Sequence, residues 1–289
     1  MAERHEIDPV SGTPLGHHQW DGIRELETRP PRWWALVYLA CVVFAVGYWI
    51  VYPTWPVGNG FTHGLFNWSS RGAANTELER AEAAQAGLNL KLAQSSLETI
   101  AKDPDLLRFA LAGGRAAFVN NCTPCHGSGA QGQPGYPNLL DDDWLWGGKL
   151  ADIQRTIQVG INSTHPDTRL TQMPAFGTAG MLNRQQINDA AEYVLSLTGH
   201  QTDPAAAKRG EAIFAQQCAS CHGPKGDGSR EVGAPRLNDA IWLYGGDKAT
   251  IVQTITLARH GVMPSWEGRL SDITIKKLTL YVHSLGGGE

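Results

Sequence analysis

The chain has 289 residues, a hydrophobic fraction of 42%, a charged fraction of 18% and a formal net charge of −4. This composition is typical of a folded protein and excludes an intrinsically disordered chain. The net charge is too small to indicate a nucleic-acid partner, which would call for a strongly basic surface. The length allows about two domains.

Residues 1–32 form a polar segment with glycine, proline and charges of both signs. This composition predicts a short cytoplasmic tail with little regular structure.

Residues 33–52 then form a run of twenty residues without a charged side chain. A helix of that length spans about 30 Å, the thickness of the hydrocarbon core of a bilayer, and Trp and Tyr cluster at both of its ends. We expect a retained transmembrane helix in contact with lipid. A cleaved signal peptide is disfavoured because a long polar stretch precedes the run and no small-residue cleavage motif follows it.

The basic residues around this run predict its orientation. Arg24, Arg29 and Arg32 precede it closely, whereas the first basic residue after it is Arg71. The positive-inside rule therefore places the N-terminus in the cytoplasm and the rest of the chain outside. Residues 53–103 come next and are predicted to be an irregular linker followed by a spacer helix from about residue 76.

Two pentapeptides, residues 122–126 and 218–222, share the pattern Cys-x-x-Cys-His. This is the attachment pattern of a c-type haem, in which each thiol bonds to one vinyl group of the porphyrin and the histidine binds the iron. Zinc is the alternative for a single motif. It would need two further ligands, and no second cysteine pair is left once both motifs are assigned. We therefore predict two covalently bound haem c groups. Their protein ligands are Cys122, Cys125, His126, Cys218, Cys221 and His222.

The motifs lie in an internal repeat with copies at residues 104–200 and 204–289. The two motif histidines are 96 positions apart, and Trp144 and Trp242 are 98 apart. Helical patterns precede each motif and end each copy, and no strand-like alternation occurs. The sequence thus predicts an all-α fold, with one N-terminal transmembrane helix followed by two tandem cytochrome c domains. A small domain has little apolar core, so the porphyrin would supply much of it. The candidate pocket walls are Leu139, Trp144, Trp146, Leu237, Trp242 and Tyr244.

Met173 and Met263 are the candidates for the remaining axial iron ligands. They occupy matched places in the repeat, and each precedes a proline that would stiffen its loop. We expect each methionine to serve the haem of its own repeat, with the opposite pairing as the alternative. Met181 has no counterpart in the second copy. The rival ligands are His165, His200, His260 and His283.

With these residues placed, the chain resembles the membrane-bound dihaem cytochrome c subunit (subunit III, the P subunit) of cbb3-type cytochrome c oxidases. The likeness covers almost the whole chain. It rests on Trp20-Asp21-Gly22-Ile23, Arg32-Trp33-Trp34, Val46-Gly47-Tyr48-Trp49, Gly135-Tyr136-Pro137-Asn138-Leu139, the stretch from Asp141 to Gly148, Ile241-Trp242-Leu243-Tyr244-Gly245-Gly246 and Tyr281-Val282-His283-Ser284-Leu285-Gly286.

The resemblance implies a respiratory electron-transfer subunit in a bacterial inner membrane, with its haem domains in the periplasm. It would receive electrons from a periplasmic donor cytochrome c. It would pass them through a monohaem cytochrome c subunit to the haem–copper catalytic subunit, where oxygen is reduced and protons are pumped. Two readings stay open beside it: an anchored dihaem cytochrome that serves a periplasmic dehydrogenase, and a dihaem peroxidase. Because both irons have two axial ligand candidates, the chain itself is expected to transfer electrons and to hold no catalytic residue.

Overall fold

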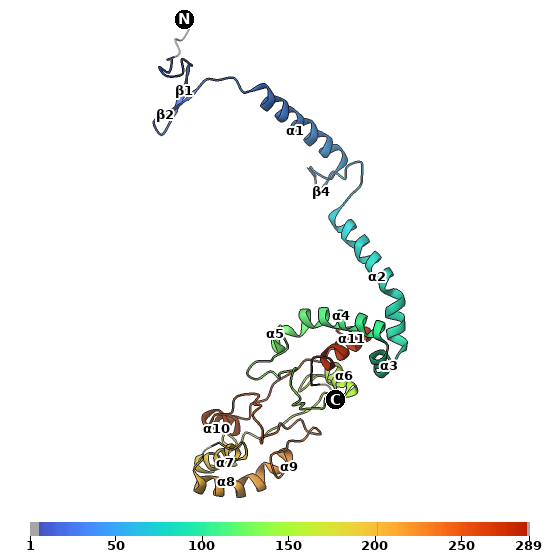
Figure 1. Cartoon of the computed structure of the whole chain (residues 1–289), viewed down its shortest axis with the longest axis vertical. Coiled ribbons are helices and arrows are strands. Elements are labelled where there is room, and N and C mark those ends of the chain that lie inside the picture. Colours follow the sequence, from blue (N-terminus) through green and yellow to red (C-terminus); the bar gives the residue numbers. More distant parts are fainter. Residues whose placement is uncertain (1–5, 201, 288–289) are drawn as a thin grey trace. The chain divides into compact units, whose positions relative to one another are not determined.

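The computed structural model describes residues 6–200 and 202–287. The chain divides into two compact units, residues 1–84 and 85–289, and each is described by itself. Figure 1 shows the order of the elements. The elements that begin in the first unit are β1 (Leu15–Trp20), β2 (Ile23–Leu26), α1 (Arg32–Val51), β3 (Pro56–Val57), β4 (Gly60–Phe61) and α2 (Ser70–Gln94). Those of the second are α3 (Leu97–Lys102), α4 (Pro104–Asn121), α5 (Thr123–His126), α6 (Leu150–Val159), α7 (Arg184–Leu197), α8 (Pro204–Gln217), α9 (Ala219–His222), α10 (Lys248–Leu257) and α11 (Asp272–His283).

The N-terminal segment contains an antiparallel hairpin, β1–β2, in which Trp20 pairs with Ile23. The turn between them is Asp21-Gly22, and both residues have a positive φ, 50° and 86°. Asp-Gly favours such a turn because its twist matches that of the flanking strands. The expectation of little regular structure was therefore wrong for residues 15–26, although the Asp-Gly pair was a readable turn signal.

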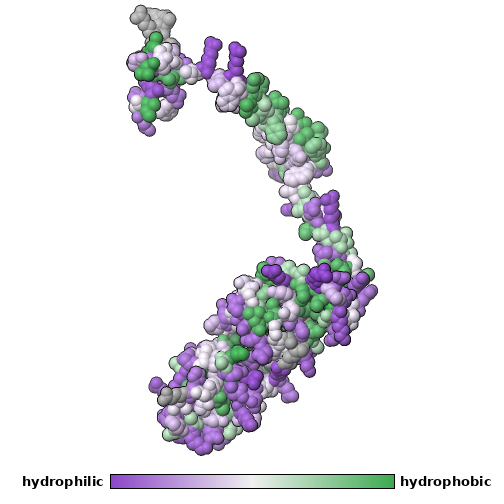
Figure 2. Space-filling model, in the orientation of Figure 1, coloured by the Kyte–Doolittle hydropathy of each residue, from purple (hydrophilic) through white to green (hydrophobic). Residues whose placement is uncertain are grey.

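Helix α1 coincides with the predicted membrane segment to within one residue at each end. Its mean hydropathy is 2.2 and none of its side chains is buried inside the protein. Figure 2 shows the apolar surface that it presents. In residues 6–200 and 202–287 it is the one helix long and apolar enough to cross a membrane. A protein surface this apolar would be unfavourable in water, so the exposed face of α1 fits lipid or a membrane-embedded partner.

The predicted spacer helix is α2, which begins at Ser70, six residues earlier than expected. A break at Ser95-Ser96 separates it from α3. Ser96 caps α3 by accepting a hydrogen bond from the backbone N–H of Thr99 at 3.2 Å. The end of α2, with Leu92 fully buried, packs on α3, α4 and Leu280 of α11.

The helices of the two repeats pack crosswise in the second unit. Helix α4, which precedes the first motif, packs against α11, the last helix of the second repeat, whereas α7 of the first repeat packs against α8 of the second (Figure 1). We call α4, α5, α6 and α11 the first half, and α7, α8, α9 and α10 the second half. The expectation that residues 104–200 and 204–289 each pack as a domain differs from this arrangement. The helices that precede each motif, α4 and α8, and those that end each copy, α7 and α11, were predicted.

Two matched glycines permit both helix crossings. A Cβ atom at Gly114 of α4 would lie 2.2 Å from the carbonyl oxygen of Lys277, and one at Gly210 of α8 would lie 1.9 Å from that of Asp189. Only glycine allows two helix backbones to approach so closely. One turn further along, tilted aromatic pairs fill each crossing. Their ring centroids are 5.4 Å apart for Phe118–Tyr281 and 5.1 Å apart for Tyr193–Phe214.

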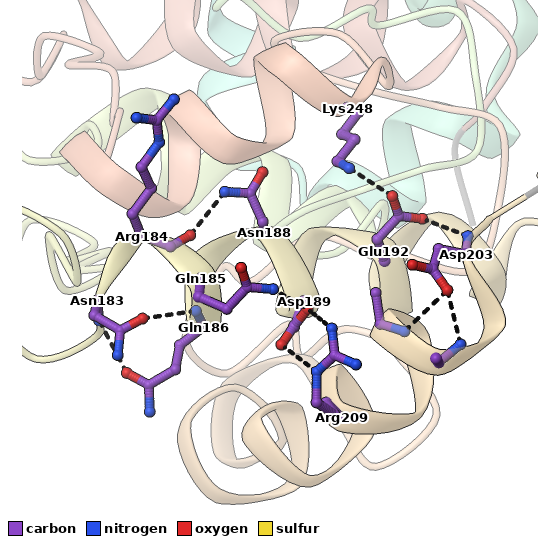
Figure 3. Close-up of polar contacts among 12 residues, drawn as sticks. Asn183, Arg184, Gln185, Gln186, Asn188, Asp189, Glu192, Asp203, Arg209 and Lys248 are labelled. Carbon is purple, nitrogen blue, oxygen red and sulfur yellow. Dashed lines mark hydrogen bonds and ion pairs between the residues drawn. The ribbon is translucent and has the colours of Figure 1, made fainter.

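Polar contacts also fasten α7 to the second repeat (Figure 3). The buried carboxylate of Asp189 accepts two hydrogen bonds from Arg209 of α8, at 2.7 and 2.8 Å. Glu192 pairs with Lys248 of α10 at 2.6 Å and accepts from the backbone N–H of Asp203 at 3.2 Å. A buried carboxylate needs such partners, so these bonds favour the crossed pairing of α7 with α8 and α10.

The chain crosses between the halves in the loops that carry the two methionines. Ile161 and Met263 form a two-bond backbone bridge, each N–H donating to the other's carbonyl at 2.9 Å. Beyond Met263, the N–H of Trp266 donates to the carbonyl of Ile157 at the end of α6. Beyond Met173, the N–H of Thr178 donates to the carbonyl of Thr256 in α10. Each repeat therefore delivers its methionine loop and last helix to the other half.

Candidate haem sites

Each attachment motif forms one turn of helix directly after a long helix, α4 or α8. The N–H of His126 donates to the carbonyl of Cys122 at 2.9 Å, and that of His222 to the carbonyl of Cys218 at 3.0 Å. In a helical turn, residues three and four positions apart lie on one face. The geometry therefore brings the two thiols and the imidazole of each motif to the same side, as attachment of one porphyrin requires.

A backbone carbonyl orients each imidazole. Nδ1 of His126 lies 3.0 Å from the carbonyl oxygen of Pro137, and Nδ1 of His222 lies 2.9 Å from that of Pro235. A carbonyl oxygen can only accept, so Nδ1 carries the proton and Nε2 is free to bind a metal. Burial lowers the pKa of both histidines, which favours the neutral imidazole that binds iron.

The first cysteine of each motif is partly buried. Burial, with a smaller contribution from the neighbouring Cys125 or Cys221, raises the pKa of Cys122 and of Cys218 to about 11. Both thiols are therefore neutral at physiological pH. A thioether is neutral as well, so bonding these sulfurs to a porphyrin places no charge in the apolar surroundings.

A single cavity of about 1050 Å³ joins the two motifs. All six predicted wall residues line it, together with both candidate methionines and all six motif ligands. A cavity of this size is at the top of the range for small-molecule sites, and it is lined mainly by apolar and aromatic side chains, which suit a porphyrin. The free Nε2 atoms, the neutral thiols and these walls fit haem c.

The two methionines lie in the opposite halves from those expected. Met173 packs against the apolar cluster of the second half, as Cys218 does, whereas Met263 packs against that of the first half, as Cys122 does. This corrects the expectation that each methionine accompanies the motif of its own repeat. The reason is the crossing of the chain after α6 and after α10. Met181 is about half exposed and stands away from the cavity walls.

Of the rival ligands, one lies at the cavity. His260 is exposed, lines the cavity edge, and its Nδ1 lies 2.9 Å from the carbonyl oxygen of Ala258. His165 lines no part of the cavity and pairs with Glu267 at 3.1 Å.

Two stacked arginines were missed by the sequence reasoning. Arg169 lies over the ring of Trp146, 5.0 Å from its centroid, and Arg259 lies over the ring of Tyr244 at 4.6 Å. Such cation–π contacts hold a ring in one orientation. The signal was present, because each arginine stands four residues before a candidate methionine and alignment of the two copies would have matched them.

Three family models match this chain. The N-terminal domain of cytochrome oxidase-cbb3, FixP, matches residues 12–59; cytochrome c matches residues 111–198; and cytochrome c oxidase, cbb3-type, subunit III matches residues 205–282. Among curated relatives, the cbb3-type cytochrome c oxidase subunit FixP of Bradyrhizobium sp. (strain ORS 278) is 51% identical over 293 residues that cover both chains completely. Subunit CcoP of Cereibacter sphaeroides is 49% identical over 277 residues, 96% of each chain, and CcoP of Azospirillum brasilense is 49% identical over the whole of both.

The chain belongs to the FixP/CcoP family of cbb3-type cytochrome c oxidase subunits. The predicted resemblance and fold class are thereby confirmed. A FixP/CcoP chain is a subunit of a membrane-bound respiratory oxidase and works in complex with other subunits of it. Its cytochrome c domains imply covalently bound haem c. This membership favours the oxidase over the two other readings, a dehydrogenase-linked cytochrome and a peroxidase.

Proposed function

We propose that this chain binds two haem c groups and takes electrons from a periplasmic donor cytochrome c. It passes them on, through a monohaem cytochrome c subunit, towards the haem–copper centre of the oxidase. The observation that carries the proposal is the pair of matched attachment motifs and methionines around one apolar cavity. The haem iron supplies a reversible one-electron change between Fe(III) and Fe(II), and the chain supplies ligands and surroundings.

The ligand sets follow from the crossed packing. The first haem would be held by Cys122, Cys125 and His126 of the first repeat and by Met263 of the second. The second haem would be held by Cys218, Cys221, His222 and Met173. With one histidine and one methionine to bind each iron, neither iron would keep an open position for oxygen or peroxide. This arrangement supports outer-sphere electron transfer and opposes a dihaem peroxidase.

The structure of the methionine loops suits a weak ligand. The thioether favours Fe(II) over Fe(III) and so raises the potential, but its weak bond needs a rigid support. The bridge to Ile161 fixes the backbone of Met263, and a Cβ atom at Gly160 would lie 2.3 Å from the Met263 carbonyl oxygen. The backbone at Met263 therefore has little freedom to move away.

Replacement of each candidate methionine tests the ligand assignment and the function together. Histidine is a better donor to Fe(III), so Met263→His should lower the potential of the first haem and Met173→His that of the second, by about 60 mV or more, a tenfold change for one electron. Oxygen consumption driven by a reduced donor cytochrome should fall in both variants. Met181→His is the matched control and should leave both potentials unchanged. A shift in Met181→His without one in Met173→His would contradict the assignment.

Two further measurements test the cofactor count and the complex. Haem staining on denaturing gels should survive the loss of either cysteine pair alone and disappear only when both pairs are replaced. Purification from membranes in mild detergent should recover an oxygen-reducing haem–copper subunit with the chain. A stain that persists without all four cysteines, or a chain that purifies without that subunit, would refute the corresponding part.

The orientation is part of the same proposal. With Arg24, Arg29 and Arg32 on the cytoplasmic side of α1, the haem-binding unit lies in the periplasm of a bacterial inner membrane. A reporter active only in the periplasm should be active when fused after Glu289 and inactive when fused at residue 10. The reverse pattern would show that the arginines do not determine the topology.

A further inference from the structure

Two aromatic rings reach across from one repeat to the other. Trp146 and Tyr244 stand 98 positions apart, at the same place in the repeated Trp-Leu-aromatic-Gly-Gly sequence. The ring of Trp146 lies on the backbone of Gly233, where a Cβ atom would be 2.3 Å from its Cζ2. The ring of Tyr244 lies on Gly135, where a Cβ atom would be 3.2 Å from its Cε1. Neither glycine could carry a side chain without displacing the ring or the loop.

These glycines belong to the loops that orient the axial histidines. We call residues 132–138 the first anchoring loop and residues 228–236 the second anchoring loop. The first ends in Pro137 and Asn138, and the Pro137 carbonyl contacts Nδ1 of His126. The second holds Pro235, whose carbonyl contacts Nδ1 of His222, only two residues after Gly233. Each ring therefore touches the loop that serves the histidine of the other repeat.

Each anchoring loop is closely packed, so a displacement of its glycine is transmitted to its proline. Ser229 and Ala234 exchange two backbone hydrogen bonds of 3.0 and 2.9 Å. A Cβ atom at Gly132 would lie 2.6 Å from the carbonyl oxygen of Tyr136, and one at Gly228 would lie 2.8 Å from that of Ala234. Backbone packed this closely moves as a body.

Each ring or its neighbouring backbone has a further contact that holds it in place. Arg169 and Arg259 stack on Trp146 and Tyr244, as described above. The N–H of Gly135 donates to the carbonyl of Leu243, next to Tyr244, at 2.7 Å. Trp146 is buried, lines the cavity, and contacts both the guanidinium of Arg169 and the backbone of the second anchoring loop.

We propose that Trp146 and Tyr244 are positioning residues exchanged between the repeats. Trp146 holds the second anchoring loop and thereby His222, and Tyr244 holds the first anchoring loop and thereby His126. The inference rests on the proposed function, because it concerns the axial ligands of the two haems. The hydrogen bond from Nδ1 to a carbonyl increases the basicity of an axial imidazole and so stabilises Fe(III). A loop that relaxes weakens this bond and raises the potential of the haem it serves.

The test is a redox titration of the full chain with both haems, followed by NMR with the signals of each haem assigned separately. Trp146→Leu should favour reduction of the haem at His222 about threefold, which is ~28 mV, and move the ring-proton signals of His222. The haem at His126 should stay unchanged. Tyr244→Leu should give the mirror result, with the shift at His126.

Two conservative variants serve as controls. Tyr244→Phe keeps the Cε1 atom that contacts Gly135 and should shift the potential of the haem at His126 by less than Tyr244→Leu does. Trp146→Phe keeps a ring without the Cζ2 contact and should shift the same haem as Trp146→Leu by less, which tests the proposal even if the leucine variant fails to fold. Three results of the leucine variants would overturn the proposal. They are a shift in potential only at the haem whose motif lies in the substituted repeat, a fall in potential at the haem of the other repeat, and no shift at either haem. Loss of haem from the unmodified chain would instead refute the proposed function.

Discussion

The two halves of the haem-binding unit have the same helix crossings, but different polar contacts stabilise them. In both, a glycine lets the exchanged helix approach and a tilted aromatic pair fills the crossing. In the second half, carboxylates of α7 bind Arg209 and Lys248. In the first half, lysines of α11 take that place. Both halves therefore need a glycine that lets the last helix of the other repeat approach closely. The polar contacts of that helix differ between the two halves.

The lysines of the first half bind the end of the spacer helix. Nζ of Lys276 donates to the carbonyl oxygens of Leu92, Ala93 and Ser95, at 3.1, 3.0 and 2.8 Å. These carbonyls lack partners within α2 because the helix ends there, and a cation is favoured at that end. Nζ of Lys277 lies over the ring of Phe109. The hydrogen bonds of Lys276 therefore secure a segment outside the repeat, whereas the contact of Lys277 with Phe109, like the ion pairs of the second half, joins one repeat to the other.

The largest effect should follow from adding a side chain at a crossing glycine. Gly210→Val places carbon atoms where the Asp189 carbonyl now lies and should cost about 4 kcal/mol or more, or abolish folding. Gly114→Val should do the same in the first half. Denaturant unfolding of the haem-loaded chain measures this, with Gly87→Ala on α2 as control, since a Cβ atom there meets nothing within 4 Å. Equal stability of Gly210→Val and the unmodified chain would show that the crossing is not as described.

A smaller loss is expected when the buried carboxylate of the second half loses its partner. Arg209→Ala should destabilise the protein by about 2 kcal/mol at neutral pH, because Asp189 stays buried with Gln185 as its remaining side-chain donor. Hydrogen bonds from Arg209 lower the pKa of Asp189 below its usual 3.8, so this stabilisation is complete above that value and disappears as the pH falls through the lowered pKa. The difference between variant and unmodified chain should therefore shrink in acid. A difference that is constant down to the acid limit would contradict the assignment.

In the first half the corresponding loss should be smaller. Lys276→Ala should cost about 1 kcal/mol, since the carbonyls of the exposed Ala93 and the half-buried Ser95 can bind water instead. Hydrogen exchange should quicken in the last turn of α2 and in α3, with no change in α7. The exposed Lys102→Ala is the control and should have no measurable effect. Faster hydrogen exchange spread evenly over both halves would contradict a local stabilisation of the end of α2 by Lys276.

A pH-dependent effect concerns Asp143, an acidic residue with no counterpart in the second repeat, where Ile241 stands. Burial, then the charges of Asp239 and Asp141, raise the pKa of Asp143 to about 6, against an opposing effect of Arg236. A carboxyl with a raised pKa in the folded state makes stability fall as the pH rises from about 4 to about 6. Asp143→Asn should remove that slope in pH-dependent unfolding, and a slope that persists would assign it to another group.

The sequence predicted those features that depend on local signals. The two motifs, whose six residues come together at one cavity, the membrane helix and the long helices each follow from residues within about twenty positions. The crossed pairing could not be predicted, because α7 and α11 follow equivalent patterns and either could pack on α4. The choice depends on contacts between distant residues, such as Asp189 with Arg209. The hairpin at Asp21-Gly22 was readable and was overlooked because the segment is rich in loop-forming residues.

The pairing of each methionine with the haem of the other repeat is tested most directly by an NMR experiment on the reduced, haem-loaded chain. A methionine whose sulfur binds iron would hold its methyl group against that haem, and each haem is identified by the cysteines to which it is bonded. The Met263 methyl group should contact the haem bonded to Cys122 and Cys125. The Met173 methyl group should contact the haem bonded to Cys218 and Cys221. Contacts of each methionine with the haem of its own repeat, or of neither methionine with any haem, would contradict this pairing.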